Sequence, residues 1–214
     1  LGAGGGALVT VLTVPGAITG VGGLTTSATV SLNGLNTFTG GLTVTAGTTT
    51  IGASGGIIAQ DVNNTGTLLV EGVVSGAAPF TKVGTGTMTL NGDNTYTGVT
   101  TVSAGILNVG HANALGSPLA GTQIASGGEL RIDGAAKTFT LNEPLEIAGP
   151  GAGVAGAISV QNQANPTFSA PIVLSGDATV AVSSTASPLF DNPSAFTSAG
   201  NHNLTLQGGL NPDG

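Results

Sequence analysis

The sequence contains no cysteine and no tryptophan, and it has very few basic side chains. Disulfide bridges and thiolate metal sites are therefore excluded. Lys82, Arg131 and Lys137 are the three cations against ten acidic residues, which gives a formal net charge of −7. A nucleic-acid-binding protein needs clustered basic side chains to neutralise phosphates, so we expect no nucleic acid among the partners.

Charge and long hydrophobic runs are also scarce. Charged residues make up 6% of the 214 residues, yet 40% are hydrophobic, whereas disordered chains combine low hydrophobicity with high charge. The best apolar run covers only residues 7–14, and a membrane-spanning helix needs about 20 residues. We therefore predict no transmembrane segment in this chain. The chain opens on Leu1 rather than Met, so we take it to be processed or an excerpt of a longer protein.

Glycine is abundant, with 38 residues, and the sequence repeats. The segments 31–54 (SLNGLNTFTGGLTVTAGTTTIGAS) and 89–112 (TLNGDNTYTGVTTVSAGILNVGHA) align without gaps at an offset of 58, and half of their aligned positions are identical. The offset fits two structural units of about 29 residues or three of about 19.

The pattern of side chains predicts strands and turns. Thr and Val alternate in Thr43–Ile51 and in Thr100–Val109, which is typical of half-buried strands. Asn-Gly at 33–34 and 91–92 marks turns, and strand-like runs recur about every 8–12 residues downstream. No long run has the apolar spacing of an amphipathic helix. We therefore predict an all-β chain.

Sandwich, closed barrel and solenoid are the three all-β candidates. Repetition with a Gly or Asn corner after nearly every short strand favours a β-solenoid, of about 7–11 coils for this length. Stacked coils need glycine at their corners and neutral Thr and Asn outside, because like charges stacked along the axis repel one another. We treat residues 1–214 as one solenoid domain, with residues 1–6 as a candidate flexible N-terminal arm.

Residues 81–116 resemble the passenger-associated transport repeat of autotransporters, also called the autotransporter-associated β-strand repeat. The matching residues are Lys82, Gly84, Gly86, Met88, Leu90, Gly92, Asn94, Thr95, Tyr96, Gly98, Thr100, Val102, Gly105 and Leu107. Residues 31–54 keep the later half of the motif. The resemblance implies a right-handed parallel β-helix in a large secreted or surface-bound bacterial protein, with no catalytic residues in the repeat.

Few residues could carry chemistry. Glu129 and Asp133 share strand parity with Arg131 between them, which would suit a polysaccharide-active enzyme, but a solvated charge ladder on the outer face is the favoured interpretation. Glu143 and Glu146 form the other close acidic group. We predict no catalytic, cofactor-binding or metal-binding residues, no cofactor and no enzymatic activity.

Two further sets of polar residues are weak site candidates. His111 and His202 lie far apart in the sequence and are expected at exposed corners. Calcium could use Asn91, Asp93 and Asn94, but the nonapeptide signature of calcium-binding β-helices is absent.

The leading functional hypothesis is a structural, extracellular protein on the bacterial surface. Both ends of a solenoid expose unpaired strand edges, so we expect the partners to be other copies, joined head to tail, or further repeats of a longer chain. The alternative is an adhesin-like passenger that contacts glycans or host surfaces. Sugar stacking would then need exposed aromatic side chains, and the chain has one Tyr and six Phe. A polysaccharide-active enzyme is the third hypothesis.

Overall fold

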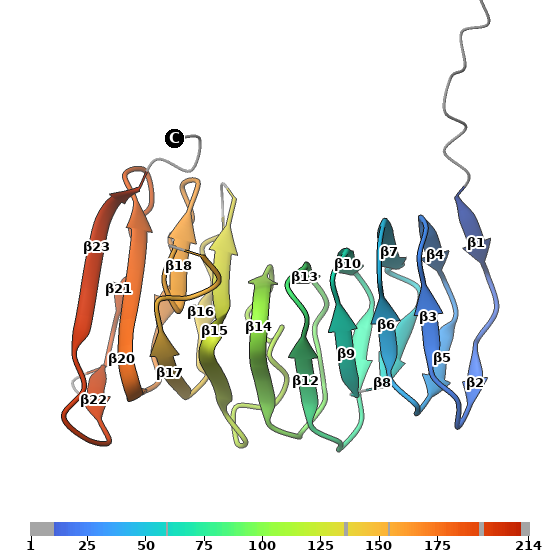
Figure 1. Cartoon of the computed structure of the whole chain (residues 1–214), viewed down its shortest axis with the longest axis horizontal. Coiled ribbons are helices and arrows are strands. Elements are labelled where there is room, and N and C mark those ends of the chain that lie inside the picture. The colour runs from blue at the N-terminus through green and yellow to red at the C-terminus, as the bar shows by residue number, and fades with distance from the viewer. Residues whose placement is uncertain (1–10, 59, 135–136, 154, 193–194, 211–214) are drawn as a thin grey trace, which may run out of the picture.

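The chain folds into stacked parallel strands, as seen in a computed structural model that describes residues 11–58, 60–134, 137–153, 155–192 and 195–210. The predicted arm, residues 1–6, lies outside the described residues. Among the described residues there are 23 strands and no helix, and the paired strands run parallel. The strands stack in about nine turns from β1 at one end to β23 at the other (Figure 1). The predicted all-β solenoid is confirmed.

Each turn of the solenoid contributes strands to three faces. The first face contains β1 (Leu12–Val14), β4 (Val30–Leu32), β7 (Thr48–Ile51), β10 (Thr67–Val70), β13 (Thr87–Leu90), β18 (Ile158–Gln161) and β23 (Leu204–Leu210). The second face contains β3 (Leu24–Thr26), β6 (Leu42–Val44), β9 (Asp61–Asn64), β12 (Phe80–Val83), β17 (Leu145–Gly149) and β22 (Phe196–Ser198). Three long strands bend through the corner and belong to both faces: β14 (Thr100–Val109), β15 (Thr122–Asp133) and β20 (Ile172–Ser183).

The third face consists of two smaller sheets. One contains β2 (Thr19–Gly20), β5 (Leu35–Phe38), β8 (Gly56–Ile58) and β11 (Val73–Ser75). The other contains β16 (Thr140–Leu141), β19 (Thr167–Phe168) and β21 (Leu189–Phe190).

The offset between the two sequence repeats corresponds to three coils. Val30 pairs with Thr49, Thr49 pairs with Leu68, and Leu68 pairs with Met88. These three steps from coil to coil lead from position 30 to position 88, which is the full offset of 58. One repeat therefore covers three short coils rather than two longer ones.

The two repeats make the same interior contacts with an asparagine. The amide oxygen of Asn36 accepts a hydrogen bond from Ile18 N at 2.9 Å, and that of Asn94, the equivalent position of the second repeat, accepts one from Val74 N at 2.8 Å. Each amide nitrogen donates to the following coil, Asn36 to Gly56 O and Asn94 to Ala114 O. Each asparagine thus joins its own coil to the coils on both sides.

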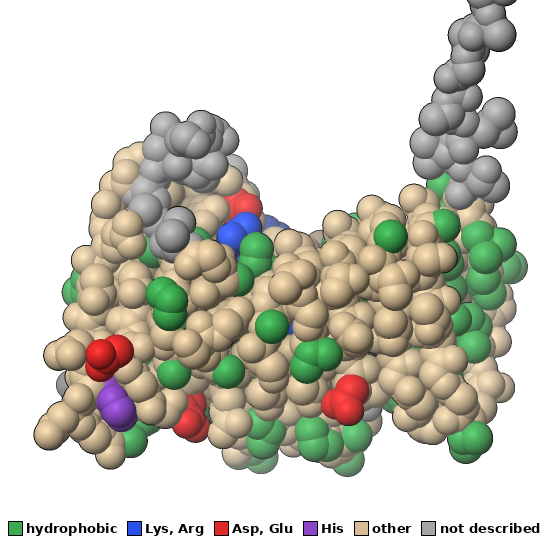
Figure 2. All heavy atoms as spheres, in the orientation of Figure 1, with side chains coloured by type: hydrophobic (Ala, Val, Ile, Leu, Met, Phe, Trp, Pro, Cys, Tyr) green, Lys and Arg blue, Asp and Glu red, His purple; other side chains and the backbone are tan. Residues whose placement is uncertain are grey.

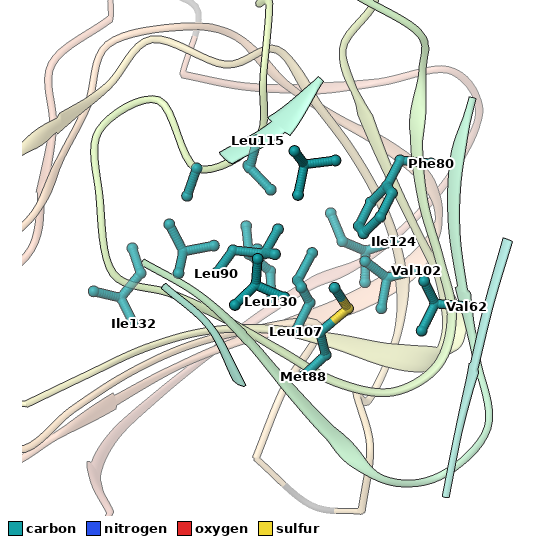
Figure 3. Close-up of a cluster of buried hydrophobic side chains, with 14 of the residues drawn as sticks. Val62, Phe80, Met88, Leu90, Val102, Leu107, Leu115, Ile124, Leu130 and Ile132 are labelled. Carbon is teal, nitrogen blue, oxygen red and sulfur yellow. The ribbon is translucent and has the colours of Figure 1, made fainter. Parts of the chain in front are cut away.

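Alternate residues of the first face point inward and form continuous apolar columns. One column, which we call the leucine column, contains Leu12, Val30, Thr49, Leu68, Met88, Leu107, Leu130, Ile158, Val180 and Leu206. Its members from Thr49 to Val180 are buried, and several lie at the centre of the core in Figure 3. The period-2 pattern of the sequence therefore sets which side chains form the core.

Candidate functional site

The acidic group around Arg131 is only partly brought together. Glu129 Oε1 accepts hydrogen bonds from Arg131 Nε at 2.7 Å and from Ser159 Oγ at 2.5 Å, whereas Asp133 Oδ1 accepts one from Asn162 Nδ2. Glu129 is fully buried, so the expected solvated ladder is wrong for this residue. At the next coil its neighbour Ser159 on β18 is buried as well and donates to it, so this part of the outer face is shielded from solvent. A sealed carboxylate does not offer a polysaccharide an acid or a base.

The second acidic group, Glu143 and Glu146, does not act as a pair. Glu143 points inward and accepts a hydrogen bond from Thr122 Oγ1 at 2.7 Å, and burial raises the pKa of its carboxyl to about 7. Glu146 is on the outer side and accepts a hydrogen bond from Gln123 Nε2 at 3.1 Å. An odd number of positions separates the two glutamates, so their side chains lie on opposite sides of the extended chain.

The histidines lie in irregular segments, both partly exposed, and each has an aspartate nearby in space. Nδ1 of His111 is 4.0 Å from Oδ1 of Asp93, in the preceding coil. Asp177 accepts a hydrogen bond from Asn203 N at 2.8 Å, which lowers the pKa of its carboxyl, and His202 lowers it further. Neither contact was predicted from the sequence, because each joins residues of successive coils that lie far apart along the chain.

The residues considered for calcium bind three different partners. Asn91 donates to Glu71 Oε1, and Asp93 accepts from Asn113. Asn94 is buried and uses its amide on the backbone of two other coils. Within the described part of the chain, no three His, Cys, Asp or Glu residues form a group that could hold a metal ion.

The lysine of the repeat motif has a structural role that the sequence did not reveal. Lys82 is fully buried, and its Nζ donates to Gly84 O at 2.9 Å and to Ala104 O at 3.0 Å. Burial lowers the pKa of this amine to about 8. Gly105 has a φ of 69°, and a Cβ at this position would lie 2.8 Å from Lys82 Nζ. Lys82 therefore joins the corners of two successive coils, and it needs glycine beside it.

The aromatic side chains are directed into the core. All seven lie within the described residues, and none is exposed. Phe80 packs against Tyr96 with ring centroids 5.3 Å apart, and Phe168 stacks on Phe190 at 4.9 Å. The Tyr96 hydroxyl forms a hydrogen bond with Thr100. An aromatic platform for sugar stacking is therefore not present among the described side chains.

Among the described residues, both ends of the stack are open and apolar. At the N-terminal end, a groove of about 390 Å³ is lined by Leu12, Val14, Ile18, Leu24, Thr25, Thr26, Ser27, Ala28, Thr29, Val30 and Leu32. At the C-terminal end, a groove of about 380 Å³ is lined by Val180, Val182, Ala186, Ser187, Pro188, Phe190, Leu206, Gln207 and Gly208. Figure 2 shows hydrophobic side chains gathered at the β1 end. We call these surfaces the N-terminal and C-terminal end faces.

The end faces expose the last members of the leucine column. Leu12 pairs with Val30 and is 59% exposed, and Leu206 pairs with Val180 and is 69% exposed. Every member between Thr49 and Val180 is covered by a coil on both sides. The exposed leucines therefore occupy positions that a further coil would bury.

Comparison with known proteins agrees with the repeat motif. The family model described as passenger-associated-transport-repeat matches residues 27–51 and 80–109. A curated relative, the adhesin BmaC autotransporter of Brucella suis biovar 1 (strain 1330), is 37% identical over 124 residues, which cover 47% of this chain. The chain spans only 4% of the length of that relative.

No solved structure matches the chain. Within its described residues, the protein has no helix with the length and hydrophobicity needed to cross a membrane. The resemblance predicted from the motif around Tyr96 is confirmed: the chain carries autotransporter-type passenger-associated transport repeats, at residues 27–51 and 80–109.

Proposed function

We propose that this chain is a structural section of a surface-exposed, adhesin-type autotransporter passenger, and that its end faces stack on further coils. The observation that carries the proposal is the exposure of Leu12 and Leu206 at the two ends of an otherwise buried column. Burying a leucine side chain contributes about 1.5–3 kcal/mol. The outer edges of β1 and β23 also pair with no other described strand, so their backbone groups can pair with a further coil.

The occupant of each end face is a coil of the same kind, from the continuing polypeptide or from a second copy. The match to 4% of a long adhesin supports this, because the matching part of that relative is a small section of a far longer chain. Neither end groove has a charged residue in its lining, so stacking brings no like charges together. A head-to-tail contact of this type propagates along the axis because it does not close.

The test is end-to-end association of the purified chain. We expect rods of several lengths in electron micrographs and a particle length in X-ray scattering that grows with protein concentration. Leu206→Arg places a charge on the C-terminal end face and should shift the chain to monomers. Leu119→Arg is the matched control, because Leu119 is 96% exposed but does not line either end groove. A chain that stays monomeric at all concentrations would refute the stacking proposal, as would equal association of both variants.

We propose adhesion as the function of the whole passenger, with localisation on the bacterial surface. The name of the relative, an adhesin, supports this. In this section the aromatic rings are turned inward, so its own role is to extend the passenger rather than to stack sugars. A glycan array tests this division. Reproducible glycan binding by the isolated chain would contradict a purely structural role, and its absence together with rod formation would support it.

A further inference from the structure

A small recess opens on the side of the solenoid beside Glu143. It lies between the turn after β14 and the segment that follows β16, has a volume of about 100 Å³, and its lining includes Asn113, Leu115, Pro118, Thr140, Asn142 and Glu143. Leu115 and Glu143 are buried, whereas Asn113, Pro118, Thr140 and Asn142 are exposed. The recess thus has an apolar and acidic base beneath a polar rim.

The carboxylate at the base has one oxygen without a partner. Glu143 is 4% exposed, and its Oε1 accepts the hydrogen bond from Thr122. Its Oε2 has no hydrogen-bond partner among the described residues, yet it is not among the polar atoms that are sealed from solvent. Because Glu143 lines the recess, we infer that the small exposed part of its carboxylate faces into it.

The charged groups nearby do not neutralise Glu143. Neither of the ion pairs within 4.0 Å in the described part of the chain includes it. Lys137 donates to Gly110 O, and His111 lies beside Asp93. Tyr96 supplies no charge either, because burial raises the pKa of its hydroxyl well above the ordinary value. A buried carboxylate without a countercharge is costly, and a bound cation would compensate it.

The size and the acceptors of the recess select the kind of cation. A volume of about 100 Å³ holds roughly three water molecules or one ammonium group with a short alkyl stem. An ammonium is a compact cation with three donors, of which one can reach the unpartnered oxygen of Glu143 while the others face the exposed rim and water. Calcium takes six to eight oxygen ligands, usually with several carboxylates, and only one carboxylate lines this recess.

We propose that the recess at Glu143 binds a primary ammonium group, supplied by a small amine or by a lysine side chain of a partner protein. The site is on the flank of the solenoid, away from both end faces, so it is independent of coil stacking. Binding at Glu143 and end-to-end association can therefore fail separately.

The test is a titration of the full chain with n-butylammonium, followed by the amide signals of Leu115, Gly116 and Asn142 in ¹⁵N–¹H spectra. We expect saturable shifts at pH 8 and none with n-butanol, which has the same stem without the charge. Putrescine represents a free small amine and Nα-acetyl-lysine amide represents a lysine side chain. The probe that binds with the higher affinity identifies the source of the ammonium group. Saturation by n-butanol with equal affinity, or no saturable shift with n-butylammonium, would overturn the proposal.

A substitution and a change of pH test whether the carboxylate of Glu143 itself binds the ligand, as distinct from an effect on the fold. Glu143→Gln keeps the shape and the acceptor for Thr122, and we expect affinity to fall at least tenfold, while Glu146→Gln, on the outer side, leaves it unchanged. In the unmodified chain, affinity should fall by roughly two orders of magnitude from pH 8 to pH 5, because burial places the pKa of Glu143 at about 7. Equal affinity at both pH values, or in Glu143→Gln, would show that the carboxylate does not bind the ligand.

Discussion

Gln60 is a buried amide whose hydrogen bonds are not made, and replacing it should stabilise the protein. Its Nε2 and Oε1 are both sealed from solvent without a partner among the described residues. The side chain is at an inward position, because Asp61, the next residue, pairs with Thr81, so that Gln60 corresponds to Phe80 in the following coil. Each buried, unpaired polar group costs about 1–3 kcal/mol. Gln60→Met keeps a similar length without polar atoms, and we expect it to raise the free energy of unfolding by about 2 kcal/mol.

Asn36 provides the matched control, because it is a buried amide whose hydrogen bonds are made. It accepts from Ile18 N and donates to Gly34 O at 2.7 Å and to Gly56 O at 3.2 Å. Asn36→Leu removes three bonds worth about 1 kcal/mol each. We therefore expect the free energy of unfolding to fall by about 3 kcal/mol, in the direction opposite to Gln60→Met.

Urea unfolding followed by far-ultraviolet circular dichroism measures the free energy of unfolding of each variant. Amide hydrogen exchange in β5 and β9 shows which coils of the stack are stabilised or destabilised. The local measurement is needed because stacked coils can open separately. The reasoning would be refuted by a Gln60→Met chain that is less stable than the original by about 1 kcal/mol or more, or by an Asn36→Leu chain of unchanged stability.

Two further predictions concern pH and a corner glycine. The free energy of unfolding should have a minimum near pH 7–8. The raised pKa of Glu143 stabilises the fold fully below its ordinary pKa of 4.5, and this contribution is lost as pH rises through about 7. The lowered pKa of Lys82 has the opposite effect, because the cost of burying its charge is relieved as pH rises above about 8. Urea midpoints from pH 5 to pH 10 measure this, and a steady rise or fall would contradict it. Gly105→Ala should lower the free energy of unfolding by about 1–3 kcal/mol, since φ is 69° and the new Cβ would lie 2.5 Å from the carbonyl oxygen of Gly84. Gly208→Ala, with open space around it and no positive φ, should be neutral in the same urea titration, and equal losses would show that neither φ nor crowding of the new Cβ is the cause.

The sequence predicts the fold well because the solenoid is built from local rules. Alternating Thr and Val place one set of side chains in the core, and the turn residues separate short strands. The repeat offset of 58 is compatible with either two or three coils per repeat. The pairing of Val30 with Thr49 shows that there are three. The equivalence of Asn36 and Asn94 likewise follows from the repeat, but their role between coils needed the structure.

The side-chain environments could not be predicted because they depend on the neighbouring coil. Strand parity directs Glu129 outward, yet it is buried, and Ser159 of β18 in the next coil donates to its carboxylate. Glu143 is inward, where Thr122 of the preceding coil presents its hydroxyl to it. Lys82 was recognisable as a motif residue, but its acceptors include Ala104 of the following coil. In each case the deciding contact spans one turn, and the turns vary in length along the chain.

The chain needs few basic residues because amide side chains, rather than Lys or Arg, donate hydrogen bonds to many of its carboxylates. Five carboxylates accept a hydrogen bond from a neutral side-chain amide in an adjacent coil rather than from Lys or Arg: Glu71 from Asn91, Asp93 from Asn113, Asp133 from Asn162, Glu146 from Gln123 and Asp177 from Asn203. An amide supplies the donor without adding a charge that would repel its neighbour about 4.8 Å away along the axis. Half of the ten acids can thus sit in the stack without cations, and the net charge of −7 stays spread along the solenoid. Glu143 differs from these five acids, because its carboxylate accepts from the hydroxyl of Thr122 rather than from an amide, and the residue lines a recess.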